Sequence, residues 1–397
     1  MRILILNADY PRFLAWLYRR DPALSEASYV DQMSARNATL FGVADFYSRN
    51  FAELGHVAAE IHVNNSYLQS AWAREHGMAI EAPAEIASSK VQRLPGWLQR
   101  AAVPFKPLLR PLARRVGLSP RLDSQSERIL LAQIEDFRPD LILNQDAFHV
   151  DTRLIRRIKK VCNPFIIGQV GIEPSPGDDW AAYDLMISQL PTTVEWFRKR
   201  GSRAEINHLA FDPVVLERLP AAVEAPIDVS FVGTISDDHR QRIVLLEAVA
   251  RRHDLRLWGT LPRTLAASSP LHACFQGEVW GADMYQVLRR SKITLNSHID
   301  LAGREAGNMR LFEATGVGTF LLTDFKDNLH TLFELDREVA VWRTVGDCLK
   351  TVERYLGDAG GRTAIAQAGH AKTLGEHTYR HRTREILGYV ETLRPRP

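Results

Sequence analysis

Cysteine is scarce in this sequence, and the side chains that most often hold metal ions are not grouped along it. Cys162, Cys274 and Cys348 stand far apart, with neither the CxxC spacing of a zinc site nor the even number of a disulfide framework. The patterns D-x-D and HExxH are absent, as are a P-loop and a nucleophile elbow. We therefore expect a protein of a reducing compartment that binds no metal.

The sequence also lacks a strong charge of either sign and a long apolar run. Its net charge is only +3 over 397 residues, which gives no indication of a nucleic-acid partner. No window approaches the about 18–20 apolar residues of a membrane span. The opening MRILIL is too short for the apolar region of a signal peptide. These absences predict a cytoplasmic location.

One segment, residues 86–122, has no acidic residue at all. Its basic residues alternate with apolar ones, which is typical of a surface that contacts an anionic membrane or an anionic acceptor. We consider two alternatives: a solvated insertion that packs on its own domain, and a peripheral contact at the inner face of the membrane through residues 90–121. A single long helix is excluded by the prolines at 95, 104, 107 and 111.

The order of apolar runs predicts an α/β protein with two doubly wound, Rossmann-like domains that face each other across a cleft. Apolar runs such as residues 2–6, 57–63 and 140–146 alternate with helical patterns, as in a parallel sheet covered on both faces. The chain is long enough for two domains of ordinary size. We expect a first domain over 1–210, which includes the basic insertion, a second over 211–376, and a helix over 377–397 that packs back toward the first.

The stretch REAGNMRLFEATGVGTFLLTD, residues 304–324, carries the clearest indication of chemistry. Asn308 is able to cap a helix that starts beside it, and the amino end of a helix attracts phosphate. Arg310 in the first turn adds fixed donors, and Glu313 lies on the same face, where a carboxylate accepts hydrogen bonds from ribose hydroxyls. This pattern indicates a site for a nucleoside diphosphate. The alternative is an exposed ion pair between Arg310 and Glu313.

Three runs of the second half resemble a known family. SFVGTISDDHRQRIVLLEAV, GEVWGADMYQVLRRSKITLNSHI and NMRLFEATGVGTFLLTD, with a closing helix, are similar to the C-terminal half of CgeB-type glycosyltransferases of the GT-B group. The resemblance covers about residues 227–390. It implies a bacterial enzyme of glycan biosynthesis with an acceptor-binding first domain and a nucleotide-sugar-binding second domain, and with no cofactor beyond the nucleotide-sugar co-substrate.

The resemblance also assigns residues to the donor site. Glu313 and Arg310 match the family's RxFE pattern, in which the Glu binds ribose. The glycine turn that faces the diphosphate corresponds to Gly233 and Thr234, although a plain strand-end turn is the alternative. The nucleobase is bordered by Trp258, Gly259 and Trp280, unless the two Trp side chains are core. The predicted donor-binding set is completed by His298, Asn308 and Met309.

Three residues are candidates for the catalytic group. Glu305 completes the spacing of Glu, seven residues, Glu that many retaining GT-B enzymes have, although Ala306 and Gly307 replace the usual Phe-Gly after it. His149 and Asp9 follow predicted strands in the first domain, where a base that takes a proton from the acceptor is expected.

The resulting hypothesis is a metal-independent, hexosyltransferase-like enzyme. It transfers a sugar from a nucleotide sugar to a glycan, a lipid-linked molecule, a protein or a small molecule. Two alternatives stay open at this point: a nucleotide-sugar epimerase on the same fold, and a non-catalytic nucleotide-binding protein.

Overall fold

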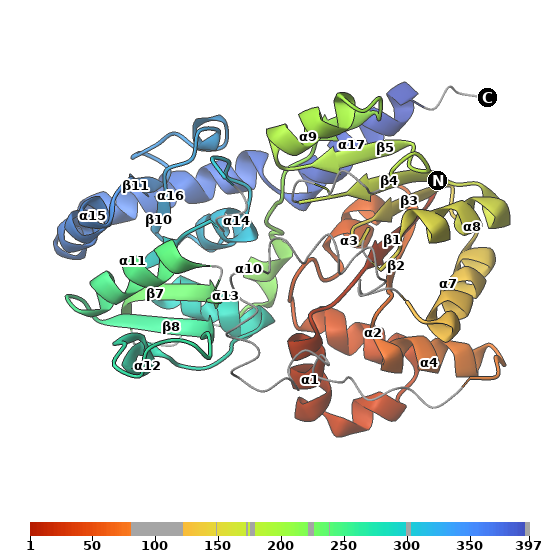
Figure 1. The fold of residues 1–397 in the computed structure, drawn as a ribbon, viewed down its shortest axis with the longest axis horizontal. Helices are drawn as coiled ribbons and strands as arrows, with labels where there is room; N and C mark the ends of the chain where they lie inside the picture. Colours follow the sequence, from red (N-terminus) through yellow and green to blue (C-terminus); the bar gives the residue numbers. More distant parts are fainter. Residues whose placement is uncertain are drawn as a thin grey trace. The chain divides into compact units, whose positions relative to one another are not determined.

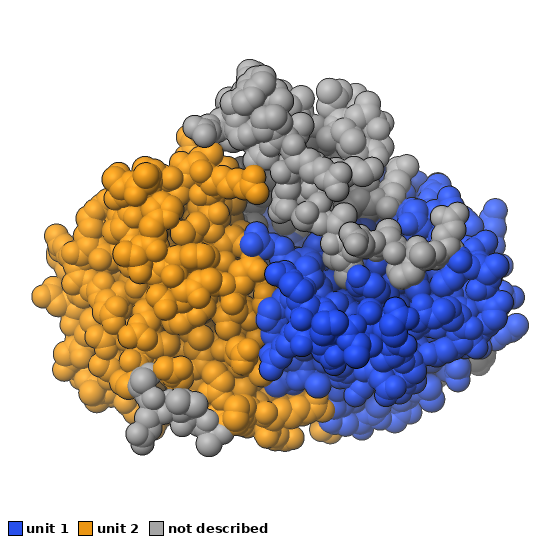
Figure 2. All heavy atoms as spheres, turned by 90° about the horizontal axis from the view of Figure 1, so that it is seen from below, with its two compact units in different colours: residues 1–206 blue, residues 207–397 orange. Residues whose placement is uncertain are grey.

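The computed structural model describes residues 1–80, 122–147, 149–171, 174, 179–220, 226–237, 239–298 and 303–393. The predicted basic surface over 90–121 lies outside the described residues. The chain divides into two compact units, Met1–Ile206 and Asn207–Pro397, which Figure 2 shows in blue and orange. Among the described residues, no helix combines the length and the apolar character needed to cross a membrane.

Unit 1 is built on a six-stranded sheet in the order β2-β1-β3-β4-β5-β6, and its strands all run parallel (Figure 1). The strands are β1 (Arg2–Asn7), β2 (Val57–His62), β3 (Leu141–Asn144), β4 (Phe165–Gln169), β5 (Leu185–Ser188) and β6 (Ala204–Ile206). Every residue of β3 and β5 is buried. This continuous burial is the pattern of strands that are covered on both faces.

The described helices of unit 1 connect these strands. They are α1 (Pro11–Arg20), α2 (Tyr29–Ala38), α3 (Phe46–Glu53), α4 (Ser66–Glu75), α7 (Ser124–Phe137), α8 (Thr152–Cys162) and α9 (Pro191–Arg198), with a 3-10 turn at Pro22–Glu26. Side chains cap several of them: Asp123 accepts from the backbone of Ser126, and Asp151 from that of Leu154.

The sequence pattern also suggested one continuous helix over about 38–54, and this prediction is wrong. Helix α2 ends at Ala38 and α3 begins only at Phe46. Between them the chain takes left-handed backbone angles at Leu40 (φ 60°), Gly42 (φ 65°) and Ala44 (φ 39°). A right-handed helix cannot pass through such residues. Of the apolar residues in this turn, Leu40 and Ala44 are buried, and Phe41 and Val43 are partly buried.

Unit 2 holds a five-stranded parallel sheet in the order β11-β10-β9-β7-β8 (Figure 1). The strands are β7 (Ile227–Thr234), β8 (Leu255–Thr260), β9 (Ser291–Asn296), β10 (Leu321–Asp324) and β11 (Ala340–Trp342). Its described helices are α10 (Val214–Arg218), α11 (Arg240–Ala250), α12 (Leu271–Cys274), α13 (Gly281–Arg290), α14 (Met309–Gly316), α15 (Val345–Gly357), α16 (Ala359–Glu376) and α17 (Tyr379–Leu393), with a 3-10 turn at Leu329–Thr331.

The strand order of each sheet reverses once, and this reversal positions a binding site. In unit 1 the chain leaves β1 toward β2 on one side, and β3 lies on the other side. In unit 2 the corresponding pair is β7 and β9, because β8 lies on the far side of β7. Ligands of open α/β sheets bind outside the carboxyl ends of the strands at such a switch point. The residues just after β1, β3, β7 and β9 are therefore expected to line binding sites.

A close backbone approach at one of these edges requires glycine at position 259. Gly259 has φ 131°, and it pairs with Gly233 across β7 and β8. A Cβ atom on Gly259 would lie 2.0 Å from the carbonyl oxygen of Gly233. No rotation of a side chain relieves such a contact, because both atoms belong to the backbone.

We expect Gly259→Ala to destabilise unit 2 by more than the about 1–3 kcal/mol that a non-glycine residue costs at such a backbone angle. Gly277→Ala is the matched control, because Gly277 has φ 93° but no atom within 4 Å of the added Cβ. Denaturant unfolding of both variants measures the difference. Equal destabilisation by the two substitutions would contradict the close approach.

Candidate functional site

The carboxyl ends of β7 and β8 bring four of the predicted donor residues to one edge. Gly233 and Thr234 end β7, and they pair in register with Gly259 and Thr260 of β8. The Thr234 side chain is exposed. Trp258 near the end of β8 and Trp280 at the amino end of α13 are only partly buried, so neither is a plain core side chain. Both are available to border a flat ligand.

Arg242 of α11 bridges the switch point of unit 2, and the sequence analysis missed it. Its guanidinium donates to the carbonyl oxygen of Thr234 over 2.6 Å and to that of Ser297 over 2.5 Å. It thereby ties the chain after β7 to the chain after β9 and buries a positive charge at this edge. Helical spacing was a usable signal, because Arg242 lies three and four residues before the buried Leu245 and Leu246.

Helix α14 begins at this edge with an open amino end. Asn308 occupies the cap position as predicted, but its side chain caps nothing. Instead, the Asn308 and Asn296 amides exchange two hydrogen bonds of 2.8 and 3.2 Å. The Asn308 side chain thus accepts from none of the first amide N–H groups of α14, although the Leu311 N–H donates to the Asn308 backbone carbonyl over 3.4 Å. A helix end without a side-chain cap suits an anion. Met309, the first residue of the helix, is partly buried.

Arg310 and Glu313 form an ion pair of 2.8 Å on α14, and the pair is buried rather than exposed. Glu313 is only 6% exposed, and the Arg310 side chain 13%. Two Arg310 nitrogens also lie 3.3 and 3.4 Å from the sulfur of Met284. Burial raises the pKa of the Glu313 carboxyl, while the Arg310 charge acts to lower it. A buried, oriented carboxylate of this kind suits the binding of a hydroxyl pair.

Glu305 lies on the loop between β9 and α14 and is partly buried. The loop is held by Asn328, whose side chain exchanges hydrogen bonds with the backbone of Ala306 over 2.6 and 3.0 Å. Further along the same edge, His298 donates its backbone N–H to Asp324, and its Nδ1 atom lies 2.7 Å from the Asp324 carboxylate. Most of the donor residues predicted in unit 2 therefore share one edge of its sheet.

In unit 1, the residues after β3 form a pair of His149 and Asp146. The Nδ1 atom of His149 contacts the Asp146 carboxylate, and the other carboxylate oxygen accepts the His149 backbone N–H over 3.3 Å. The His149 side chain is 22% exposed. A carboxylate on Nδ1 fixes the ring and leaves Nε2 to take a proton. This pair stands at the switch point of unit 1, next to β1.

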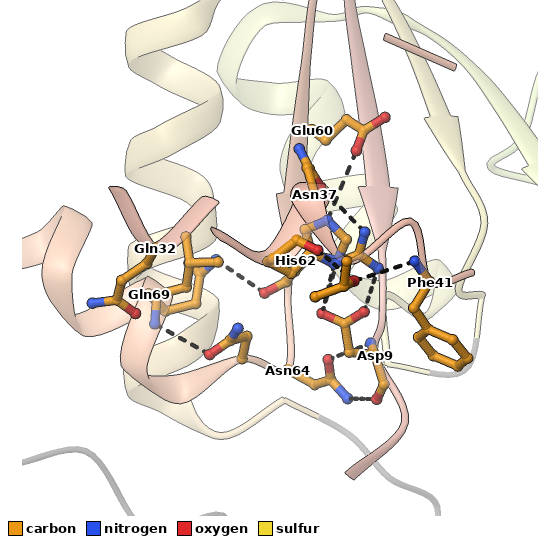
Figure 3. A network of polar contacts seen from close by, with 12 residues as sticks. Asp9, Gln32, Asn37, Phe41, Glu60, His62, Asn64 and Gln69 are labelled. Atoms are coloured by element: carbon orange, nitrogen blue, oxygen red, sulfur yellow. Dashed lines mark hydrogen bonds and ion pairs between the residues drawn. The ribbon is translucent and has the colours of Figure 1, made fainter. Parts of the chain in front are cut away.

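Asp9, after β1, lies in a buried network rather than on an open surface (Figure 3). Its carboxylate is 2.6 Å from an Arg36 nitrogen and 3.0 Å from Nδ1 of His62. The backbone of Asp9 exchanges two further hydrogen bonds with the Asn64 side chain, of 2.8 and 2.7 Å. Glu60 is the fourth charged member, 3.8 Å from Nε2 of His62.

The charges of this network decide how Asp9 behaves. Burial alone raises the pKa of Asp9, but Arg36 and His62 outweigh it and hold that pKa far below its usual value. A carboxylate with so low a pKa is a weak base. Asp9 as the catalytic base stays a prediction, and these surroundings favour a positioning role for it.

Residues 240–388 match the sequence model of a protein family described as glycosyl transferase-like. The match begins at the start of α11, ends within α17, and covers less than half of the chain. These residues form a glycosyl transferase-like domain. No curated protein sequence matches the chain.

Solved structures of glycosyltransferases share the fold over nearly the whole chain. HepE of Anabaena, in complex with UDP-glucose, has a TM-score of 0.55 at 12% identity, over 99% of this chain and 100% of HepE. A glycosyltransferase of Rickettsia africae has 0.55 at 9%, over 99% and 98%. Sucrose-phosphate synthase of Thermosynechococcus elongatus has 0.54 at 10%, over 99% of both chains. These matches confirm the predicted GT-B class of two parallel α/β domains, and at such low identity they show the fold alone.

The glycosyl transferase-like domain contains most of the predicted donor residues and Glu305, while Gly233 and Thr234 lie just before it in the same sheet. His149 and Asp9 belong to unit 1. In the described part of the chain, no three His, Cys, Asp or Glu side chains are arranged to hold a metal ion. The roles of these residues, metal independence and the CgeB-type assignment stay predictions.

The network around Asp9 makes stability depend on pH. Burial and Arg36 lower the pKa of His62, but the Asp9 and Glu60 carboxylates outweigh them, so that pKa is raised above 6.5. Protonated His62 therefore stabilises the fold fully at pH values below 6.5. This contribution is lost as the pH rises through the raised pKa of His62.

We expect the stability of the chain to fall above pH 6.5 by up to about 1.4 kcal/mol per pH unit, and the fall to be smaller in His62→Gln. Denaturant midpoints between pH 6.5 and 9 measure it. Burial lowers the pKa of His377 to about 4. The contribution of His377 to the free energy of unfolding therefore changes below pH 6.5 and not in this range. The exposed His272→Gln is the control that keeps the slope. A wild-type slope in His62→Gln would contradict the argument.

Proposed function

We propose that the chain is a glycosyltransferase that moves a sugar from a nucleotide sugar to a hydroxyl group of an acceptor. The observation that carries this proposal is the edge of unit 2 where α14 begins. There an uncapped helix end, Arg310 and the buried carboxylate of Glu313 lie within two turns of one helix. The first two attract a diphosphate, and the third accepts hydrogen bonds from ribose hydroxyls.

The donor is proposed to be a nucleotide sugar, with UDP-sugars as the first to test. Structures of HepE hold UDP-glucose and UDP, and this chain shares its fold. Trp258 and Trp280 are the proposed contacts of the base, and Gly233 and Gly259 give the diphosphate room for close approach to the backbone. A thermal-shift screen of UDP, GDP, ADP, CDP and dTDP tests this. If no nucleotide stabilises the protein, the proposed function is wrong.

The proposed reaction needs a base and a stabilised leaving group. His149 takes the proton of the acceptor hydroxyl on Nε2 while the acceptor oxygen bonds to the anomeric carbon of the sugar. The bond from that carbon to the diphosphate oxygen breaks, and the nucleoside diphosphate leaves with the electron pair. Its negative charge is stabilised by Arg310 and the amino end of α14, so that the proposal needs no metal ion.

The acceptor is proposed to be a glycan, a lipid-linked molecule, a protein or a small molecule, and the enzyme to work in the cytoplasm in bacterial glycan biosynthesis. Contact with the inner face of a membrane through residues 90–121 belongs to this proposal. Pelleting with anionic vesicles tests that contact, and an enzyme that stays wholly in the supernatant at low salt would contradict it.

Glu313→Gln is expected to weaken the binding of UDP by about 1–3 kcal/mol, because the amide accepts ribose hydrogen bonds less well than a charged carboxylate. Inorganic pyrophosphate, which has no ribose, should bind to the variant and the wild type alike. Calorimetry with both ligands measures the difference. The control is Glu391→Gln on the exposed side of α17. Equal loss of both ligands would contradict the ribose contact.

His149→Ala is expected to lower kcat by about 10²–10⁴-fold, the usual contribution of a general base, and to leave the affinity for the donor unchanged. His76→Ala in the same unit is the matched control, since its ring stacks on Trp72 away from the pair. The sugar configuration of the product is a second measurement. An inverted product agrees with His149 as the base, whereas a retained one would favour Glu305.

A further inference from the structure

A continuous chain of hydrogen bonds runs from the amino end of α14 to Asp324 at the end of β10. Asn308 bonds to Asn296, and the Asn296 side chain donates to the Thr323 hydroxyl over 3.0 Å. That hydroxyl donates to the Asp324 carboxylate over 3.3 Å. The helix end and Asp324 are therefore parts of one rigid polar cluster at the carboxyl edge of the sheet.

His298 is the last member of this cluster, and one of its ring nitrogens has no partner within the part of the chain that the structure describes. Its Nδ1 atom lies 2.7 Å from Asp324, and its backbone N–H donates to the two oxygens of the same carboxylate over 3.1 and 3.2 Å. The side chain is 1% exposed. Among the described residues, nothing bonds to the buried Nε2 atom. Leaving a buried polar atom unpaired is costly, and a ligand atom would remove that cost.

The charges around His298 indicate the chemistry of that ligand. Lys326 lies 3.5 Å from Asp324, so the single carboxylate faces a lysine as well as the imidazole. The Arg242 guanidinium donates to the carbonyl oxygen of Ser297, the residue before His298. The positive end of α14 adds to them. Lys326 and Arg242 against the Asp324 carboxylate give this edge an excess of positive charge, which suits an anion.

We propose that His298 donates its Nε2–H to the diphosphate of the bound nucleotide, and that Asp324 is the positioning residue that fixes the ring for this contact. The inference rests on the proposed function, and it assigns Asp324 a role that no sequence pattern predicted. Because Nδ1 lies against the Asp324 carboxylate, the proposed Nε2–H contact requires the form of the ring in which both nitrogens are donors. His298 then supplies part of the charge that stabilises the leaving group.

Two substitutions at His298 separate this role from a structural one. Asn reproduces the donor at Nδ1 and keeps the bond to Asp324, but it has nothing at the position of Nε2. Gln places a donor near Nε2 and gives up the bond to Asp324. A purely structural histidine is therefore better replaced by Asn, and a ligand-binding one by Gln. His272→Gln is the control, since His272 is exposed in the same unit.

The experiment measures the affinities of full-length wild type and variants for UDP, uridine and inorganic pyrophosphate by calorimetry, with thermal unfolding as the test of folding. If the thermal-shift screen favours another nucleoside diphosphate, that nucleotide and its nucleoside replace UDP and uridine in the titrations. We expect His298→Asn to fold and to bind UDP and pyrophosphate at least 10-fold more weakly, with uridine unchanged. His298→Gln should stay within about threefold of wild type. Asp324→Asn should weaken the two diphosphate ligands, and add little to His298→Asn.

Three results would overturn the assignment while leaving the proposed function intact: wild-type affinity of His298→Asn for UDP, an equal loss in His298→Gln, or an equal loss for uridine and UDP. A wild-type protein that binds no nucleoside diphosphate would instead overturn the proposed function, and this inference with it. The two failures are distinguished by the wild-type titration alone.

Discussion

The parallel direction of all strands within each sheet is the constraint on which the candidate sites depend. Because every carboxyl end lies at the same edge, residues from distant parts of the sequence meet there. In unit 2 this places Gly259, His298 and Asp324 along one edge, although 65 positions separate the first from the last. In unit 1 it does the same for Asp9, His62 and Asp146. An antiparallel arrangement would send half of these side chains to the opposite edge.

Charges gathered at such an edge become partly or fully buried, and burial determines how they behave. An unpaired buried charge is strongly unfavourable, and removing one partner of a buried pair typically costs about 3–5 kcal/mol. Three buried carboxylates at these sites accordingly face a cation: Asp9 faces Arg36, Glu313 faces Arg310, and Asp324 faces Lys326. The same pairs fix the positions of the groups that a ligand would meet. Stability and positioning therefore have one physical cause here.

Local patterns in the sequence predicted the elements whose residues are contiguous. The apolar runs at residues 2–6 and 57–63 became β1 and β2 within one residue of the expected positions, because a short apolar run before a turn residue is a buried strand in most α/β proteins. The helix start at Asn308, with Arg310 and Glu313 on its first two turns, was also predicted, because these residues are contiguous in the sequence.

Contacts between distant residues could not be predicted in this way. In the sequence, Asp324 is only a polar residue at the end of an apolar run. In the structure, the pairing of β9 with β10 places His298 beside it. From the sequence, the Asn308 side chain is expected to cap the helix. In the structure it bonds to the Asn296 side chain instead. Asp9 and Arg36 lie 27 positions apart in the sequence, and only the folded chain brings their charges together. In each case tertiary packing overrode the local preference.

The two histidine–aspartate pairs share one arrangement and differ in exposure, as the two roles proposed for them require. Both hold Nδ1 against a carboxylate at the carboxyl edge of a parallel sheet. The His149 side chain is 22% exposed, so a ligand that arrives from solvent can reach it, as the proposed base requires. The His298 side chain is 1% exposed, so its ring is shielded from water. A charge held in such surroundings acts on a phosphate with little screening, which suits the stabilisation of a leaving group rather than proton transfer.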